Sequence, residues 1–165
     1  MNKSGIVRKI DDLGRIVLPK ELRKSLNINS GDDFEIIIND QSILLKKYSK
    51  LESYETNINK ILKIFTFYTK YNIFVTINNV LTNDKTDKIT NVISSLISER
   101  KIYINDKIEQ NIISEKITIE GKLLILPIVY NSDLLGAIII IAKDNIDNIK
   151  IIANIINNLI KNNFN

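Results

Sequence analysis

Arginine is the most informative residue type in this chain, because there are only four: Arg8, Arg15, Arg23 and Arg100. Three of them fall inside one short segment, GIVRKIDDLGRIVLPKELRKSL, near the start of the chain. A guanidinium group is a planar fork of donors that matches phosphate oxygens and the edge of guanine better than a lysine ammonium does. The clustering therefore indicates a surface that contacts nucleic acid.

The distribution of charge supports the same interpretation. Residues 1–24 contain seven basic and three acidic side chains, a net charge of +4 that equals the net charge of the whole chain. Residues 51–165 are nearly balanced, with thirteen basic and twelve acidic side chains. The positive charge available for phosphates is therefore concentrated at the N-terminal end.

The chain lacks two residue types that commonly carry out catalysis or bind metals, cysteine and histidine. Disulfides, thiolates, the commonest general base and the commonest zinc ligand are therefore all missing. Asp11 and Asp12 are adjacent on a turn, where they point apart, and no third ligand is spaced nearby. We expect these acids to form local salt links that orient the arginines. We expect no metal, no cofactor and no enzymatic activity.

The N-terminal fifty residues are expected to form only a few short secondary-structure elements, and these must position the basic side chains. Apolar alternation and turn residues predict a basic helix that starts after Pro19, with Lys20, Arg23 and Lys24 on one face. Gly14 is expected to take a positive φ. So short a segment cannot bury a sufficient core alone, so we expect an intertwined homodimer. The predicted elements are strands at 6–10 and 15–18, turns at 11–14 and 29–32, a helix at 20–26, and a hairpin of 33–39 with 43–48.

The remainder of the chain reads as an α+β sandwich. Helices 54–71 and 145–163 have apolar stripes so wide that we expect burial on two sides, against a sheet and against a partner. The longest apolar run is far shorter than the roughly 20 residues of a membrane span, so we expect a cytoplasmic protein. The other predicted elements are a helix at 84–99 capped by Thr86 or Asp87, and strands at 72–78, 102–104, 116–120, 122–130 and 134–143, with Gly136 at a close approach or a bulge.

The pattern GIVRKIDDLGRIVLPKELRKSL, followed by GD, EI and ILLKKY, resembles the DNA-binding domain of AbrB-type transition-state regulators. The resemblance implies a swapped-hairpin dimeric β-barrel over residues 1–50 that binds double-stranded DNA. Carried over position by position, it implies DNA contacts from Arg8, Arg15 and Arg23. Lys24 stands where the family often has a further arginine, and it keeps the charge without the bidentate fork. Lys9 and Lys20 are secondary candidates.

The segment LPIVYNSDLLGAIIIIAKD, residues 126–144, resembles the GAF-like C-terminal domain of the longer, sporulation-associated members of this family. This resemblance implies a GAF-like α/β sandwich over residues 51–165 that links dimers into a homotetramer. Two roles stay open for it: binding a small effector through residues that the sequence does not identify, or oligomerisation alone. The implied function is a sequence-preferring transcription regulator of sporulation or stationary-phase genes. The alternative is an antitoxin-like module whose C-terminal domain binds a protein.

Overall fold

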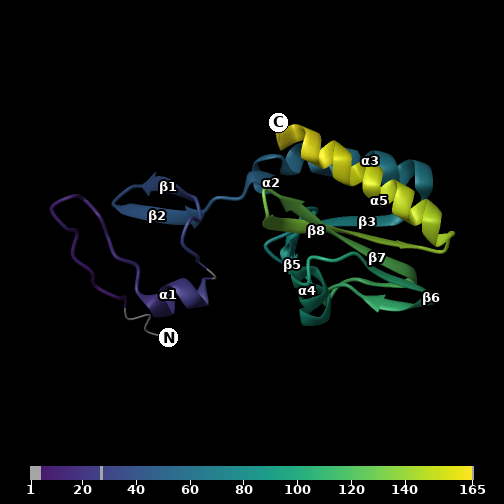
Figure 1. Cartoon of the computed structure of the whole chain (residues 1–165), viewed down its shortest axis with the longest axis horizontal. Helices are drawn as coiled ribbons and strands as arrows, with labels where there is room; N and C mark the ends of the chain where they lie inside the picture. The colour runs from purple at the N-terminus through teal and green to yellow at the C-terminus, as the bar shows by residue number, and fades with distance from the viewer. Residues whose placement is uncertain (1–4, 27, 165) are drawn as a thin grey trace. The chain divides into compact units, whose positions relative to one another are not determined.

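The computed structural model describes residues 5–26 and 28–164, and the chain divides into two compact units, residues 1–48 and 49–165 (Figure 1). The N-terminal unit contains one short helix and one hairpin. Its elements are α1 (Lys20–Ser25), β1 (Phe34–Asn39) and β2 (Ser42–Lys47).

Local sequence explains both of these elements. Helix α1 begins directly after Pro19, whose φ of −56° already suits the first turn of a helix. Strands β1 and β2 pair antiparallel from Phe34 opposite Lys47 to Asn39 opposite Ser42, and Asp40 adopts a left-handed φ of 47° in the connection. Gly14 has a φ of 75° in the first turn. The predicted helix, hairpin and turn are therefore confirmed.

The strands predicted at 6–10 and 15–18 are wrong for the single chain. Both segments are extended without being paired, and one backbone bond joins the ends of the turn between them, from the N–H of Asp11 to the carbonyl of Arg15 (3.1 Å). A strand needs a neighbour that accepts and donates hydrogen bonds along its length. The sequence has the right residues for strands here, but the described part of this chain supplies no neighbour.

The N-terminal unit also lacks a core of its own. Among the described residues, no side chain before Leu51 is buried. Burying a large aliphatic side chain stabilises the folded state by about 1.5–3 kcal/mol. Because these side chains are exposed, the unit lacks most of the hydrophobic stabilisation that a domain needs. The exposed large hydrophobic residues are Ile6, Val7, Ile10, Leu13, Ile16, Val17, Leu26, Ile36, Ile38, Ile43, Leu44, Leu45 and Tyr48.

The C-terminal unit is built around a six-stranded antiparallel sheet with the strand order β5-β4-β3-β8-β7-β6. Its strands are β3 (Asn72–Ile77), β4 (Val80–Leu81), β5 (Asp84–Lys88), β6 (Tyr103–Ile112), β7 (Thr118–Tyr130) and β8 (Asp133–Ala142). Its helices are α2 (Lys50–Ser53), α3 (Glu55–Thr69), α4 (Asn91–Ser98) and α5 (Ile146–Lys161), and a 3₁₀ turn (Asn162–Phe164) follows α5.

The sheet is covered on both faces, which explains the apolar sequence of β8. Helices α3 and α5 lie side by side over one face, and α4 lies against the other (Figure 1). Ile138 and Ile140 of β8 belong to the first core, whereas Ile139 and Ile141 belong to the second. A strand buried on both faces reads as a continuous apolar run. No helix in the described residues has the length and apolarity needed to cross a membrane.

The helix predicted at 84–99 is wrong in its first half. Residues 84–88 form the edge strand β5, and α4 begins only at Asn91, where the Thr90 hydroxyl accepts the N–H of Ile93 (3.4 Å). Thr86 and Asp87, the predicted caps, are strand residues. The other boundaries differ less: β6 extends through residues 105–112, and β7 runs without a break past Gly121.

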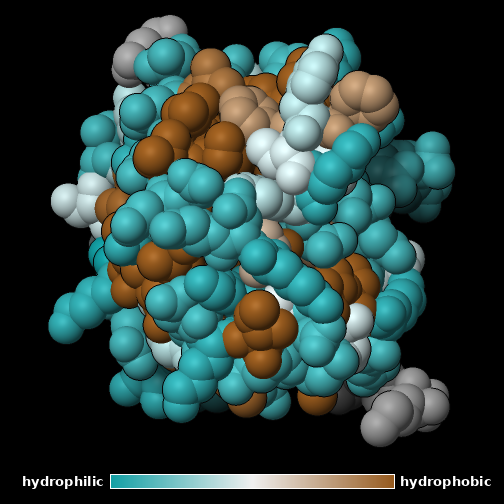
Figure 2. Space-filling model, turned by 90° about the vertical axis from the view of Figure 1, so that its right-hand side faces the viewer, coloured by the Kyte–Doolittle hydropathy of each residue, from teal (hydrophilic) through white to brown (hydrophobic). Residues whose placement is uncertain are grey.

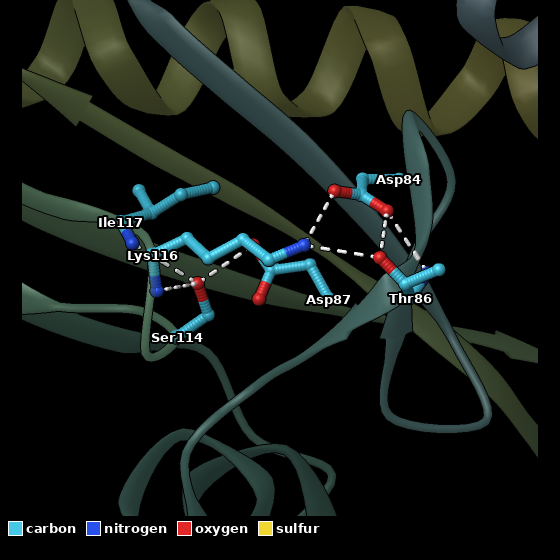
Figure 3. A network of polar contacts seen from close by, with 6 residues as sticks. All are labelled: Asp84, Thr86, Asp87, Ser114, Lys116 and Ile117. Atoms are coloured by element: carbon cyan, nitrogen blue, oxygen red, sulfur yellow. Dashed lines mark hydrogen bonds and ion pairs between the residues drawn. The ribbon is translucent and has the colours of Figure 1, made fainter.

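Tertiary contacts hold β5 in place, and Figure 3 shows them. The buried Ser114 hydroxyl donates to Asp87 (2.8 Å), and the ammonium of Lys116 donates to Asp84 (2.9 Å). Hydrogen bonds from Thr86, and then the bond from Lys116, lower the pKa of Asp84 to about 2. These partners lie about thirty residues away along the chain, so a local pattern could not reveal them.

Gly136 sits at a close approach, one of the two placements that the sequence predicts. A Cβ atom built there would lie 1.9 Å from the carbonyl oxygen of Thr76 on the neighbouring strand. That oxygen belongs to the ladder between β3 and β8, so it cannot move aside without breaking the pairing.

We therefore expect Gly136→Ala to destabilise the protein by about 1–3 kcal/mol, the usual cost of overpacking a core. Thermal unfolding followed by circular dichroism measures the loss. Gly5→Ala is the control and should leave the unfolding temperature nearly unchanged, because nothing lies within 4 Å of a Cβ atom built there and its φ is not positive. A Gly136→Ala protein as stable as the wild type would contradict the close approach.

Candidate nucleic-acid interface

Three of the six predicted contact residues surround one hollow in the N-terminal unit. Lys20, Arg23 and Lys24 line it together with Ile28 and Asn29, and it encloses about 350 Å³. The spacing i, i+3 and i+4 places the three cations on one face of α1. All three are exposed, and the hollow has no acidic lining, so its chemistry suits an anion such as a phosphate group.

The far wall of the hollow comes from the turn after α1. The N–H of Ile28 donates to the carbonyl of Arg23 (2.7 Å), and the N–H of Asn29 donates to the carboxylate of Asp32 (2.7 Å). Asp32 also pairs with Lys47 of β2 (2.8 Å), so the turn is tied to the hairpin. The bond from Asn29, and then the one from Lys47, lower the pKa of Asp32. Sequence reasoning recognised this turn but missed Ile28 and Asn29 as lining residues.

Arg15 is anchored by Asp11 across the first turn. One oxygen of the Asp11 carboxylate accepts the backbone N–H groups of Leu13 (3.0 Å) and Arg15 (2.8 Å). The other accepts Nε of Arg15 (2.8 Å). The bond from the Arg15 N–H, followed by the bond from its side chain, lowers the pKa of Asp11. The predicted salt link is thus present, and Asp11 rather than Asp12 makes it.

This anchor leaves Arg15 available to a ligand. Its side chain remains 69% exposed, and the salt link uses Nε, so the Nη groups have no partner among the described residues. An exposed ion pair adds little to stability, so its effect is chiefly to restrict the arginine. Ordering the side chain before binding reduces the entropy that binding must overcome.

Arg8 and Lys9 lie apart from the hollow. Both are exposed on the unpaired segment 5–10, and Arg8 makes one long bond to the neighbouring carbonyl of Val7 (3.4 Å). The structure of one chain therefore brings together Lys20, Arg23 and Lys24 and leaves Arg8, Lys9 and Arg15 on extended segments. No group of His, Cys, Asp or Glu suited to a metal ion occurs among the residues that the structure describes.

Comparison with known proteins places these features in a family. A family model described as antidote-toxin recognition MazE, bacterial antitoxin, matches residues 7–53. Transition state regulatory protein AbrB of Bacillus subtilis is 54% identical over 48 residues, which are 29% of this chain and 50% of AbrB. Stage V sporulation protein T of Bacillus subtilis is 30% identical over an alignment 158 residues long, which covers 87% of this chain and 86% of that protein. The chain belongs to the AbrB-type family of transition-state regulators.

Within the AbrB-type family, this chain has the longer, two-part organisation. Its similarity to stage V sporulation protein T runs along most of both chains, whereas its similarity to AbrB is confined to a stretch of 48 residues. The mixed fold, an N-terminal hairpin unit followed by a sheet-and-helix unit, agrees with that organisation. The resemblance seen in the sequence is confirmed.

The Asp11–Arg15 link gives this site a testable pH dependence. Because the folded pKa of Asp11 is depressed, the link should be intact above the ordinary carboxyl pKa of 3.8 and should be lost only at lower pH. The Nε–H resonance of Arg15, followed by NMR, should titrate with a midpoint below 3.8. Asp11→Asn should abolish that titration, and a midpoint at or above 3.8 would refute the link.

Proposed function

We propose that this AbrB-type chain is a sequence-preferring DNA-binding transcription regulator of sporulation or stationary-phase genes, acting in the cytoplasm. Residues 1–50 form its DNA-binding domain, with contacts from Arg8, Arg15, Arg23 and Lys24 and secondary contacts from Lys9 and Lys20. One observation carries the proposal: all six basic side chains are exposed, and three of them surround a hollow suited to phosphate. Phosphate contacts supply most of the affinity of such surfaces and make it sensitive to salt.

The DNA-binding form is a homodimer with a swapped-hairpin barrel. The N-terminal unit buries no described side chain, and its extended segments 6–10 and 15–18 leave backbone groups unpaired. A second copy supplies both of the missing components, strand neighbours and an apolar face. The dimer also presents two sets of arginines, which doubles the positive surface along the duplex.

Residues 51–165 form a GAF-like domain that links dimers into a homotetramer. The outward faces of α3 and α5 carry exposed apolar side chains, and apolar atoms break the hydrophilic surface along the top of Figure 2, the side of these helices in Figure 1. So many neighbouring apolar residues are typical of an interface. They are Ile64, Tyr68, Ile151, Ile155 and Leu159. Sensing of a small effector is a further role open to this domain.

An antitoxin-like function is the second candidate, because the matching family model is described as an antitoxin that recognises a toxin. That match ends at residue 53, whereas the similarity to stage V sporulation protein T continues through the C-terminal unit. The C-terminal unit is a folded sheet with helices on both faces. These observations favour the regulator.

DNA binding is tested by titrating labelled AT-rich promoter DNA and scrambled DNA with the full-length protein at several salt concentrations. If about eight phosphates are neutralised per dimer, the logarithm of the association constant should fall against the logarithm of salt concentration with a slope near −7. Promoter DNA should bind more tightly than scrambled DNA, and the triple variant Arg8→Ala, Arg15→Ala, Arg23→Ala should lose binding.

A charge-matched control separates a specific surface from general attraction. Lys88, Lys101 and Lys107 are exposed residues of the C-terminal unit, and changing all three to Ala removes the same positive charge. That variant should bind DNA nearly as well as the wild type. Absence of binding by a folded wild-type oligomer would refute the regulator and favour the antitoxin-like function.

The tetramer has its own test. Ile64→Glu combined with Ile151→Glu places charges on the exposed faces of α3 and α5, where a desolvated carboxylate without a partner is costly. Sedimentation equilibrium should change from a tetramer to a dimer. Val92→Glu, on the exposed side of α4 across the sheet, is the control and should leave the tetramer intact. A double variant that stays tetrameric would exclude this face.

A further inference from the structure

Strand β3 has a partly open edge. Strand β4 pairs with Thr76 and Ile77, and one further bond from the N–H of Thr82 reaches the carbonyl of Val75 (2.9 Å). Beyond that point the chain turns away into β5. On the side away from β8, no strand in the described residues pairs with residues 72–74.

The backbone groups on this edge that no described strand pairs with are those of Ile73. In an antiparallel sheet, residues two apart along a strand direct their N–H and C=O groups towards the same neighbour. The carbonyl of Val75 bonds to Thr82 on the β4 side, so Ile73 directs its N–H and C=O to that side as well. An unpaired strand edge is a template for another extended chain.

A groove of about 610 Å³ lies along this edge, between β3 and helix α3. Its volume falls within the usual range of ligand sites, about 300–1,000 Å³. The apolar lining comes from Leu62 and Phe67 of α3 and from Ile73 and Phe74 of β3. A groove walled by a helix on one side and a free strand edge on the other is the geometry in which peptides bind by strand addition.

Hydrogen bonds hold the rim of the groove in place. The side-chain amide of Asn59 on α3 donates to the carbonyl of Thr82 (3.0 Å), and the Thr82 hydroxyl donates back to Asn59 (2.9 Å). These bonds tie the loop after β4 to the helix. A binding site that is formed in advance loses less entropy when a ligand binds.

The groove carries one charge, and it is positive. Lys63 is the charged residue that lines it, and this lysine is exposed and makes no ion pair with any described residue. Asn72 and Asn83 add uncharged amides at the rim. An acidic group in the ligand would therefore find a complementary partner, whereas a basic ligand would be repelled.

We infer that the α3–β3 groove binds an extended peptide segment with alternating apolar side chains and an acidic residue, which adds as a strand to the open edge of β3. The segment's backbone pairs with the N–H and C=O of Ile73, its apolar side chains pack on Leu62 and Phe67, and its carboxylate faces Lys63. The open edge spans three residues, about 10 Å, so a short segment suffices. This site lies within the C-terminal unit and is separate from the basic residues of the N-terminal unit.

The probe is a fluorescein-labelled hexapeptide of alternating threonine and valine with one central glutamate, titrated with the full-length protein by fluorescence anisotropy. We expect saturable binding and a loss of at least about tenfold in affinity for Lys63→Glu. Lys107→Glu makes the same charge change on the exposed β6 edge, at the opposite end of the sheet, and should alter affinity less than about twofold.

A second arm tests the binding mode without altering the protein. The same peptide with methylated backbone nitrogens keeps its side chains but cannot complete the strand pairing, so its affinity should fall at least about tenfold. The amide resonance of Ile73 should shift on adding the unmodified peptide and should gain protection from hydrogen exchange.

Three outcomes would overturn the inference. One is no binding of the unmodified peptide at about 1 mM. Another is equal binding of the methylated peptide, which would mark a pocket for small apolar molecules. The third is an Ile73 amide already protected in the free protein, which would show that this edge is not open. DNA binding, measured on the same samples, reports separately on the N-terminal surface.

Discussion

The N-terminal unit has no buried side chain among its described residues, and this shortage of core governs how the protein can fold. Thirteen large hydrophobic side chains of that unit are exposed in the single chain, and two extended segments lie without strand partners among the described residues. Hydrophobic burial is the dominant favourable term in folding, so a unit that buries so little is incomplete alone. Its completion by a second copy would fold the unit and would set the spacing of the arginines in one step.

The C-terminal unit, by contrast, buries two hydrophobic cores within one chain. Strand β8 lies near the centre of the sheet and contributes isoleucines to both cores, so the helices on the two faces are held to one element. Gly136 permits the close pairing of β8 with β3 that this arrangement needs. Two features at the periphery of this unit have no partner within its described residues. They are the exposed apolar side chains on the outer faces of α3 and α5, and the open edge of β3 beside its groove.

Hydrogen bonds between residues that are close in the sequence hold parts of the basic N-terminal segment in place. The Asp11 carboxylate accepts three hydrogen bonds, two of them from Arg15, and Asp32 joins the turn beside α1 to Lys47 of the hairpin. Such exposed contacts add little stability. They restrict the side chain of Arg15 and the turn beside α1, which in the proposed DNA binding would reduce the entropy lost when the complex forms.

Features that depend on neighbours along the chain could be predicted from the amino-acid sequence. Pro19 sets the start of α1, the alternation of Phe34, Ile36 and Ile38 sets the hairpin, and the basic side chains lie where helical spacing puts them. Tertiary structure alone decided that residues 84–88 form a strand, because Ser114 and Lys116 hold them from a distant part of the chain. It likewise decided that residues 6–10 stay unpaired, and it created the α3–β3 groove by ending the β4 pairing at Thr82. Local propensity acts over a few residues, whereas pairing and burial depend on which distant segments fold together.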